Sequence, residues 1–341
     1  MDRKPASETP VEEIVQGFLS LQAGTAAAEN RPLRRGTHPK GVCARAVFEV
    51  VDSAQGRDSA LAARLARGIY ASPGSYAATV RFGNSDPSMN SDWQPDVRSL
   101  SFAVELTPSG APERDATVAR QDYSLQSAPT LPFNDVNAFR VFARVARAAN
   151  EAVAMGSLPF SDQLVFAQTK SAIRQQQRQA VQPYQQLRYW SNVPFRHGSE
   201  DVVKYSAWPA GNNPARALER DNPNALRDEL IRHLNEDASM SRFEIGLQFL
   251  DTETMTYQGT RRGAAFWIEN ASIEWPEAQA PFHAIARLTL LRQSVLSTED
   301  CETMYIDVTG NSTADHAPVG EINRARWHAE VASRKARHGL A

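Results

Sequence analysis

The sequence predicts an α+β fold in which short antiparallel strands form a sheet or barrel with helices around it. Short β-type runs follow one another from about residue 42 to 131, separated by Gly, Pro, Asn, Asp and Ser clusters, and similar runs return from about residue 202 to 291. The stretch between them has helical periodicity. Short strands in series with turn signals favour an antiparallel sheet or barrel over a doubly wound parallel sheet.

The N-terminal segment predicts a helix. Thr9 stands at the N-cap, Pro10 at the first helical position and Glu12 three residues after the cap, which is the capping-box arrangement. Apolar residues then repeat along one helical face. We expect a helical arm over residues 1–30 that docks onto a body of residues 31–341. The same face could cover a neighbouring subunit, which leaves a homo-oligomer open.

The strands of the first half are expected at residues 43–51, 76–83, 99–106 and 122–126, with a helix near residues 59–69 interrupting them. In the second half, strands are expected at residues 202–208, 241–250, 264–269, 271–275 and 283–291.

Four further helices are expected. One follows a cap at Asn134, and a Gln-rich one covers about residues 161–181. Asn222 and Pro223 open a third, whose leucines recur four residues apart. A basic helix over about residues 319–337 closes the chain.

Composition limits the classes of partner. Of the 341 residues, 42% are hydrophobic and 22% charged, and the formal net charge is −2. There is no basic field to concentrate nucleic acid or an anionic membrane. No stretch approaches the roughly 20 apolar residues of a membrane span, and acidic residues follow the early charges of the N-terminus, unlike a secretory signal.

The two cysteines, Cys43 and Cys301, cannot make a disulfide framework, and their separation matches no zinc or iron–sulfur spacing. A reducing cytoplasm is the simpler location. We therefore expect a soluble cytoplasmic protein with no nucleic-acid or membrane partner.

His38 is the first candidate for chemistry. It stands immediately before an expected strand, beside Pro39 and Gly41, which favour a tight turn. A histidine on a rigid turn can act as a general acid and base near neutral pH, because its unperturbed pKa is about 6.5. An isolated histidine in a turn is more often structural, so His38 needs support from the surrounding pattern.

That support comes from a resemblance to the catalase superfamily over nearly the whole chain. His38, Lys40, Gly41 and the Phe-Glu-Val strand at residues 48–50 match the family's His-x-Lys-Gly block. Three further strings resemble the family in the same order: YAATVRFGN, DVRSLSFAVEL and QDYSLQSAPTLPF. Four later strings are more similar to the smaller catalase-related heme proteins than to full-length catalases: YWSNVPFRHG, VVKYS, IENASIEWPEAQAPFHAIARLTL and DHAPVGEINRAR.

The resemblance implies an eight-stranded antiparallel β-barrel with surrounding helices and a buried heme. It implies that His38 is the distal catalytic residue, which takes a proton from a peroxide and returns it to the departing oxygen. Arg34, Arg81 and Arg98 become candidates for the heme carboxylates, since guanidinium binds carboxylate bidentately. Plain salt bridges within the barrel are the alternative for each of them.

Several functional positions depart from the family. The serine that hydrogen-bonds the distal histidine is Gly83 here, so that orienting contact is missing. The region of the distal asparagine reads Gln126 and Ser127, either of which could hydrogen-bond a peroxide.

The iron ligand is the largest departure. The family's arginine aligns with Arg326, and its iron-binding tyrosine aligns with Glu330. The four-residue spacing fits an ordinary ion pair within a helix as well as a remnant of a ligand site. His328 would point about 200° around the helix from Glu330, and Tyr305 lies outside the helix and matches no ligand motif.

Three hypotheses follow. The first is a heme-dependent peroxidase or catalase-like oxidoreductase that acts on hydrogen peroxide or an organic hydroperoxide. The second is a catalase-like scaffold that has lost heme and binds another small molecule or a protein. The third keeps heme and acts on a specialised substrate. The sequence contains no Gly-x-Ser-x-Gly elbow, P-loop, dinucleotide fingerprint or zinc spacing.

Overall fold

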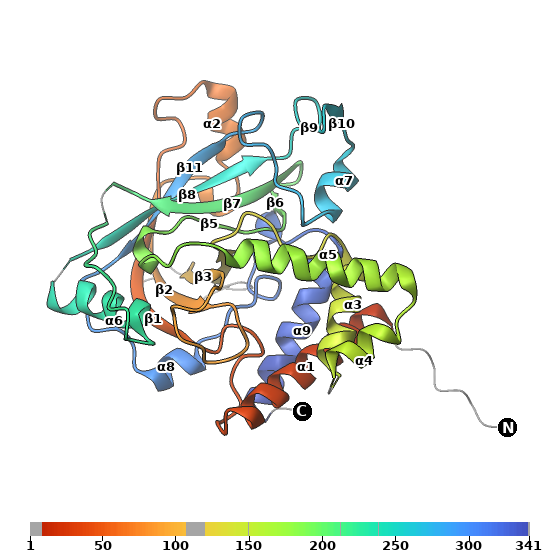
Figure 1. Ribbon diagram of the computed structural model, residues 1–341. Helices are drawn as coiled ribbons and strands as arrows, with labels where there is room; N and C mark the ends of the chain where they lie inside the picture. The colour runs from red at the N-terminus through yellow and green to blue at the C-terminus, as the bar shows by residue number, and fades with distance from the viewer. Residues whose placement is uncertain (1–8, 107–119, 149, 212, 238, 340–341) are drawn as a thin grey trace.

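A closed barrel of eight antiparallel strands forms the centre of the computed structural model (Figure 1). The model describes residues 9–106, 120–148, 150–211, 213–237 and 239–339. The strands follow the order β5-β4-β3-β2-β1-β11-β8-β7, and β5 closes the ring by pairing with both β4 and β7. The predicted antiparallel barrel is therefore confirmed. A further short strand, β6, pairs antiparallel with β7, and β9 pairs with β10 in a separate hairpin.

The strands, in chain order, are β1 Gly41–Val50, β2 Gly74–Asn84, β3 Arg98–Glu105, β4 Arg120–Gln126, β5 Tyr189–Trp190, β6 Phe195–His197, β7 Asp201–Pro209, β8 Ser241–Phe249, β9 Thr256–Tyr257, β10 Thr260–Arg261 and β11 Phe282–Leu290. The α-helices are α1 Pro10–Ala28, α2 Ser59–Leu65, α3 Val136–Ala146, α4 Glu151–Gly156, α5 Phe160–Gln177, α6 Ala225–Ile231, α7 Ala264–Glu269, α8 Thr298–Thr303 and α9 Glu321–His338. Short 3-10 turns lie at Gly68–Tyr70, Tyr184–Gln186 and Ala314–His316, and a π-helical turn at Arg232–Glu236 extends α6.

Alternation along the strands separates the two faces of the barrel. Phe48, Phe102 and Tyr123 are buried inside it, where the Phe102 and Tyr123 rings stack with centroids 4.5 Å apart. Their neighbours along the strands, such as Ser101 and Ser124, point out of the barrel and line a cavity on its outside. One face of each strand thus supplies the core, and the other supplies a polar surface.

Helices α1, α3, α5 and α9 gather on one side of the barrel (Figure 1). The predicted capping box of α1 is present, since the Glu12 amide donates to Thr9 Oγ1 at 3.3 Å and the Thr9 amide donates to Glu12 Oε2 at 2.6 Å. The fully buried Ile14 packs with side chains of α3 and α9. At Gly17 a Cβ atom would lie 2.5 Å from the Ala143 carbonyl oxygen, so glycine permits the close approach of α1 to α3. Within this chain α1 docks on α3 and α9, while residues 1–8 of the expected arm lie outside the described residues.

Two expected strands are wrong. Residues 264–269 form helix α7, and residues 271–275 carry no strand. Aromatic residues in these segments are buried in a small cluster beside the barrel, where Trp275 Nε1 donates to the Trp267 carbonyl oxygen at 3.2 Å. Tertiary burial of the tryptophans overrides the local preference for strand. The cap of α3 also differs by one residue, because Asp135 and not Asn134 accepts the Ala138 amide.

The two cysteines form one disulfide, which their spacing in the sequence does not predict. Cys43 lies on β1 and Cys301 on α8, and their Cα atoms are 5.4 Å apart although 258 residues separate them along the chain. A contact at such sequence separation is set by tertiary structure, so spacing could not indicate it.

Within the described ranges, no helix is both long enough and apolar enough to cross a membrane.

Replacing Ile14 with alanine tests the docking of α1. We expect Ile14→Ala to lower the free energy of unfolding by about 2 to 5 kcal/mol, because it leaves a cavity between α1, α3 and α9. Gln16→Ala, on the exposed face of the same helix, is the control and should change stability by less than about 0.5 kcal/mol. Chemical denaturation measures both. Equal effects of the two changes would show that α1 is not docked.

Candidate functional site

A cavity of about 670 Å³ lies between the outer face of β2, β3 and β4 and the helices α1, α3, α5 and α9. Alternate residues of the strands reach it: Arg81, Ser99, Ser101, Ser124 and Gln126. The residues that alternate with them along the strands point inward and fill the barrel core. Strand alternation therefore places these five side chains on the cavity wall.

The turn that carries His38 is fixed by its neighbours in the His-x-Lys-Gly block. Lys40 is buried and forms an ion pair with Asp92 at 2.8 Å, and its ammonium also donates to the Asn90 carbonyl oxygen at 2.9 Å. At Gly41 a Cβ atom would lie 2.6 Å from Arg81 Nη2, so glycine leaves room for the Arg81 side chain. Lys40 and Gly41 therefore hold the turn, and His38 is the member that reaches the cavity.

His38 itself has a strained backbone, with φ of 58°. This left-handed conformation is uncommon for a residue with a side chain, and it persists only where the surroundings enforce it. Arg81 Nη2 donates to the His38 carbonyl oxygen at 2.6 Å, which holds the turn in place.

The His38 imidazole is neutral at physiological pH. Burial, with smaller contributions from the positive charges of Arg81, Arg326 and Arg35, lowers its pKa to about 3. Nδ1 lies 3.0 Å from Thr37 Oγ1, while Nε2 is buried and has no hydrogen-bond partner. A buried ring nitrogen without a partner is costly unless a ligand uses it.

Thr37 supplies the orienting contact that Gly83 cannot supply. A Cβ atom at Gly83 would lie 2.7 Å from Arg81 Nη1 and 3.0 Å from the Lys40 carbonyl oxygen. The position therefore has no room for the serine of the family pattern, since Arg81 fills it. The prediction that the histidine lacks an orienting contact is therefore wrong, because the preceding residue provides one.

Three arginines converge on one end of the cavity. We call Arg35, Arg81 and Arg337 the arginine cluster; they come from the segment before β1, from β2 and from the end of α9. Burial lowers the pKa of Arg81 to about 10, with a smaller contribution from Arg337. Burial also lowers the pKa of Arg35, with contributions from Arg81 and Arg337, and that of Arg337. Glu302 opposes all three shifts. Three guanidinium groups at one end of the cavity have the chemistry that suits an anionic ligand.

The predicted arginines are only partly brought together. Arg81 and Arg326 line the cavity, whereas Arg34 and Arg98 lie outside its lining. Arg98 is buried against Asp96 at 3.4 Å and donates to the Asp92 carbonyl oxygen at 2.7 Å, so it holds the loop before β3. Sequence reasoning missed Arg35 and Arg337. Only the position of Arg35, three residues before His38, placed it near the motif.

Of the two candidates for the distal polar residue, one lines the cavity and the other does not. Gln126 lines the cavity. Ser127 is buried outside the lining, and its hydroxyl accepts the Arg98 amide at 2.9 Å. Gln126 can therefore hydrogen-bond a molecule in the cavity, and Ser127 serves the connection between β3 and β4.

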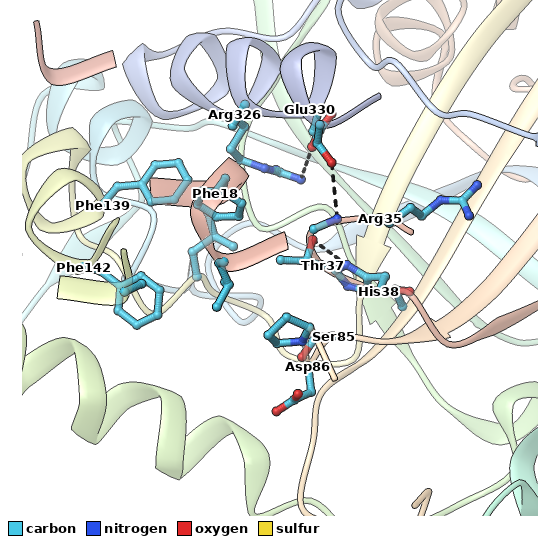
Figure 2. A pocket seen from close by; sticks show the side chains of 18 of the residues that line it. Phe18, Arg35, Thr37, His38, Ser85, Asp86, Phe139, Phe142, Arg326 and Glu330 are labelled. Carbon is cyan, nitrogen blue, oxygen red and sulfur yellow. Dashed lines mark hydrogen bonds and ion pairs between the residues drawn. The ribbon is translucent and has the colours of Figure 1, made fainter. Parts of the chain in front are cut away.

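Helix α9 presents Arg326 and Glu330 to the cavity, on the side where Thr37 and His38 lie (Figure 2). The two side chains form an ion pair at 3.6 Å across one helical turn, as the spacing predicts. The Glu330 side chain is 39% exposed and lines the cavity. Burial by the surrounding protein still raises the pKa of Glu330, and the ion pair with Arg326 works against that shift.

The two side-chain alternatives to Glu330 differ in position. His328 is exposed and lines a separate surface depression with Arg324 and Trp327. Tyr305 lies outside α9 but does line the main cavity, with the Arg334 guanidinium 4.4 Å from its ring centroid.

The other end of the cavity is aromatic (Figure 2). Phe133 stacks on Phe139 with centroids 4.7 Å apart, and Phe18 packs edge-on against Phe139 at 5.4 Å. Phe142 and Phe166 continue this wall toward α5. The cavity therefore has a cationic end and an apolar end, and it suits a molecule with both an anionic group and an apolar body.

The residues fit a heme. The arginine cluster suits its carboxylates, the aromatic wall suits its ring, and His38 Nε2 lacks a partner. Glu330 offers an oxygen donor, which is the type of ligand that hard cations such as ferric iron accept. The raised pKa of Glu330 opposes ligation by the carboxylate, and a bound cation would counter that bias.

No protein-family model matches the chain, and no curated protein matches it. Solved structures do match. They include a fungal catalase (TM-score 0.67, 13% identity, 99% of this chain and 66% of that one), catalase A from Saccharomyces cerevisiae (0.64, 13%, 92% and 63%) and a bacterial catalase (0.65, 13%, 92% and 59%).

This chain spans about two thirds or less of the length of these catalases. At 13% identity the likeness supports a shared fold and not a shared activity. The match extends over nearly all of this chain and includes the barrel and the helices around it. The chain therefore has the catalase-like fold.

Proposed function

We propose that the chain is a heme-dependent oxidoreductase that acts on a peroxide, either hydrogen peroxide or an organic hydroperoxide. One observation carries the proposal. A neutral His38 with an unpartnered Nε2 lies in the same cavity as the arginine cluster and Glu330. A proton acceptor, an anion site and an oxygen donor in one partly apolar cavity are what a heme and a peroxide would require.

The proton chemistry rests on His38. With Nδ1–H donating to Thr37 Oγ1, Nε2 is free to accept a proton from the peroxide hydroxyl. The imidazolium formed lies beside Arg81 and Arg326, whose charges disfavour it, so it readily returns the proton to the departing oxygen. The heme, when bound, supplies the iron at which the peroxide is reduced.

Substrate positioning follows from the lining of the cavity. The Gln126 amide and the hydroxyls of Ser99, Ser101 and Ser124 offer hydrogen bonds to a peroxide. The aromatic wall gives an organic hydroperoxide apolar surface to bind.

A second candidate function is a catalase-like scaffold that binds another small molecule without heme. The specific observation in its favour is Glu330, whose pKa is raised and whose side chain is paired with Arg326. An ion pair with Arg326 engages the carboxylate that would bind iron, which favours loss of the iron-binding role at the aligned tyrosine position.

Titration of the purified protein with hemin separates the two candidates. We expect heme absorbance in the Soret region, and we expect Arg337→Met to weaken hemin binding by about 10-fold or more, because a charge-assisted contact contributes about 1.5 to 3 kcal/mol. Arg324→Met, on the exposed face of the same helix at 66% side-chain exposure, is the matched control and should bind hemin like the wild type.

Substitutions of Glu330 test whether this residue donates the oxygen that binds the heme iron. We expect Glu330→Gln to bind hemin less tightly and with an altered spectrum, because it removes the ionisable oxygen, and we expect Glu330→Tyr to keep heme. If the wild type stays heme-free under adequate heme supply and Glu330→Tyr gains heme, the scaffold without heme is favoured and the oxidoreductase proposal fails.

The lowered pKa of His38 predicts an unusual pH dependence of the reaction with peroxide. Its pKa is lowered to about 3, so the neutral base is present at any pH above that value. The rate constant for reaction with peroxide should therefore stay level from pH 8 to about 5 and fall only as the pH approaches 3. We expect His38→Ala to lower it by about 10² to 10⁴-fold at pH 7. Stopped-flow measurement of the heme-loaded protein checks both, and a decline centred near pH 6.5 would contradict the assignment.

A further inference from the structure

The Cys43–Cys301 disulfide lies directly beside the arginine cluster. Cys43 on β1 is the cross-strand partner of Arg81 on β2. On the other side of the bridge, the Cys301 carbonyl oxygen accepts a hydrogen bond from Arg35 Nη2 at 3.2 Å. Both half-cystines therefore contact the backbone or side chain of a member of the cluster.

The residue after Cys301 carries the negative charge that offsets the cluster. Glu302 Oε2 lies 3.2 Å from Arg35 Nη1, and Oε1 lies 3.6 Å from Arg34 Nη1. The Arg35 and Glu302 atoms approach closely without a well-aligned hydrogen bond. Glu302 thus acts mainly through its charge, and an anionic ligand competes with it for Arg35.

Helix α8, which carries Glu302, is held by the disulfide and by Arg35, whose Nη2 donates to the Cys301 and Met304 carbonyl oxygens. Cys301 is its only buried residue, at 4% exposure. The segment is further attached by the Leu296 amide, which donates to the Cys43 carbonyl oxygen at 2.9 Å. A short surface element with so few buried contacts opens at low free-energy cost once a covalent tether is removed.

We propose that the Cys43–Cys301 disulfide is a redox-controlled latch that sets the anion affinity of the cavity. In the oxidised protein it holds Glu302 against Arg35, which lowers anion affinity. A dithiol reductant transfers two electrons, the S–S bond breaks to give two protein thiols, and the reductant becomes a disulfide. Helix α8 then moves away with Glu302, and the arginine cluster binds anions more tightly.

The latch acts on any anion at the cluster, so it does not depend on heme being the ligand. Tyr305 and Asp307, which follow α8 and line the cavity, are anchored separately: Arg120 donates to the Tyr305 carbonyl oxygen, and the Asp307 amide donates to Asp122 at 2.8 Å. The movement that follows reduction is therefore confined to α8 and Glu302.

The probe for the test is anilinonaphthalene sulfonate, a fluorescent molecule with an anionic group and an apolar body. We expect the Kd of the heme-free full chain for this probe to fall about 3- to 10-fold when the disulfide is reduced with dithiothreitol, as loss of one partly buried competing charge implies. Arg337→Met should weaken binding in both redox states, which places the probe at the cluster.

Glu302→Gln separates the latch from a general loosening of the protein. This variant should bind the probe more tightly in the oxidised state and lose most of its dependence on reduction. Glu299→Gln, on the exposed part of α8, is the matched control and should behave like the wild type. A redox dependence that survives in Glu302→Gln, or equal Kd values for the oxidised and reduced wild type, would overturn the proposal.

Hydrogen exchange gives a second measurement that needs no variant. Amides of residues 296–304 should exchange faster in the reduced wild type, while those of the barrel strands stay protected. Unchanged protection of this segment would show that the disulfide does not hold α8 and would equally reject the latch.

Discussion

The placement of Arg81 is the constraint on which the site depends. Its guanidinium lies against the two glycines of adjoining strands, Gly41 and Gly83, where a Cβ atom would come within 2.7 Å of it. From there it donates to the His38 carbonyl oxygen and contributes to the low pKa of the imidazole. One side chain thus fixes the strained turn, keeps the histidine neutral and supplies a member of the arginine cluster. The glycines of the His-x-Lys-Gly block and of the next strand are explained by the room that it needs.

The cavity concentrates positive charge in a poorly solvated place. Arg35 and Arg337 have lowered pKa values because burial disfavours their charged forms, and the negative charge of Glu302 partly offsets this lowering of their pKa. Buried like charges of this kind are stabilised when an anion binds between them. The arrangement therefore links binding of an anionic ligand to the position of α8, which carries Glu302 and is tied to the barrel by the disulfide.

The barrel positions the site through the two faces of its strands. Side chains such as Phe102 and Tyr123 make a close-packed interior, which gives the strands a fixed register. The outward positions between them are then held at fixed spacing and face the helices. Docking of α1 through Ile14 and Gly17 completes the enclosure, because Phe18 of the same helix belongs to the aromatic wall.

The sequence by itself indicated an antiparallel sheet or barrel, the capped N-terminal helix, the turn at His38 and the Arg326–Glu330 pair, while the closed eight-stranded barrel was implied by the resemblance to the catalases. These features depend on local periodicity, capping chemistry and short spacings, which a sequence displays directly. Only the tertiary structure decided that Arg35 and Arg337 line the cavity with Arg81 while Arg34 and Arg98 do not, that Thr37 contacts the histidine in place of the missing serine, and that Cys43 meets Cys301. It also decided that residues 264–269 are helical. In each case the partners lie far apart in the chain, or adjacent residues point to opposite sides, so packing and not local pattern sets which side chains meet.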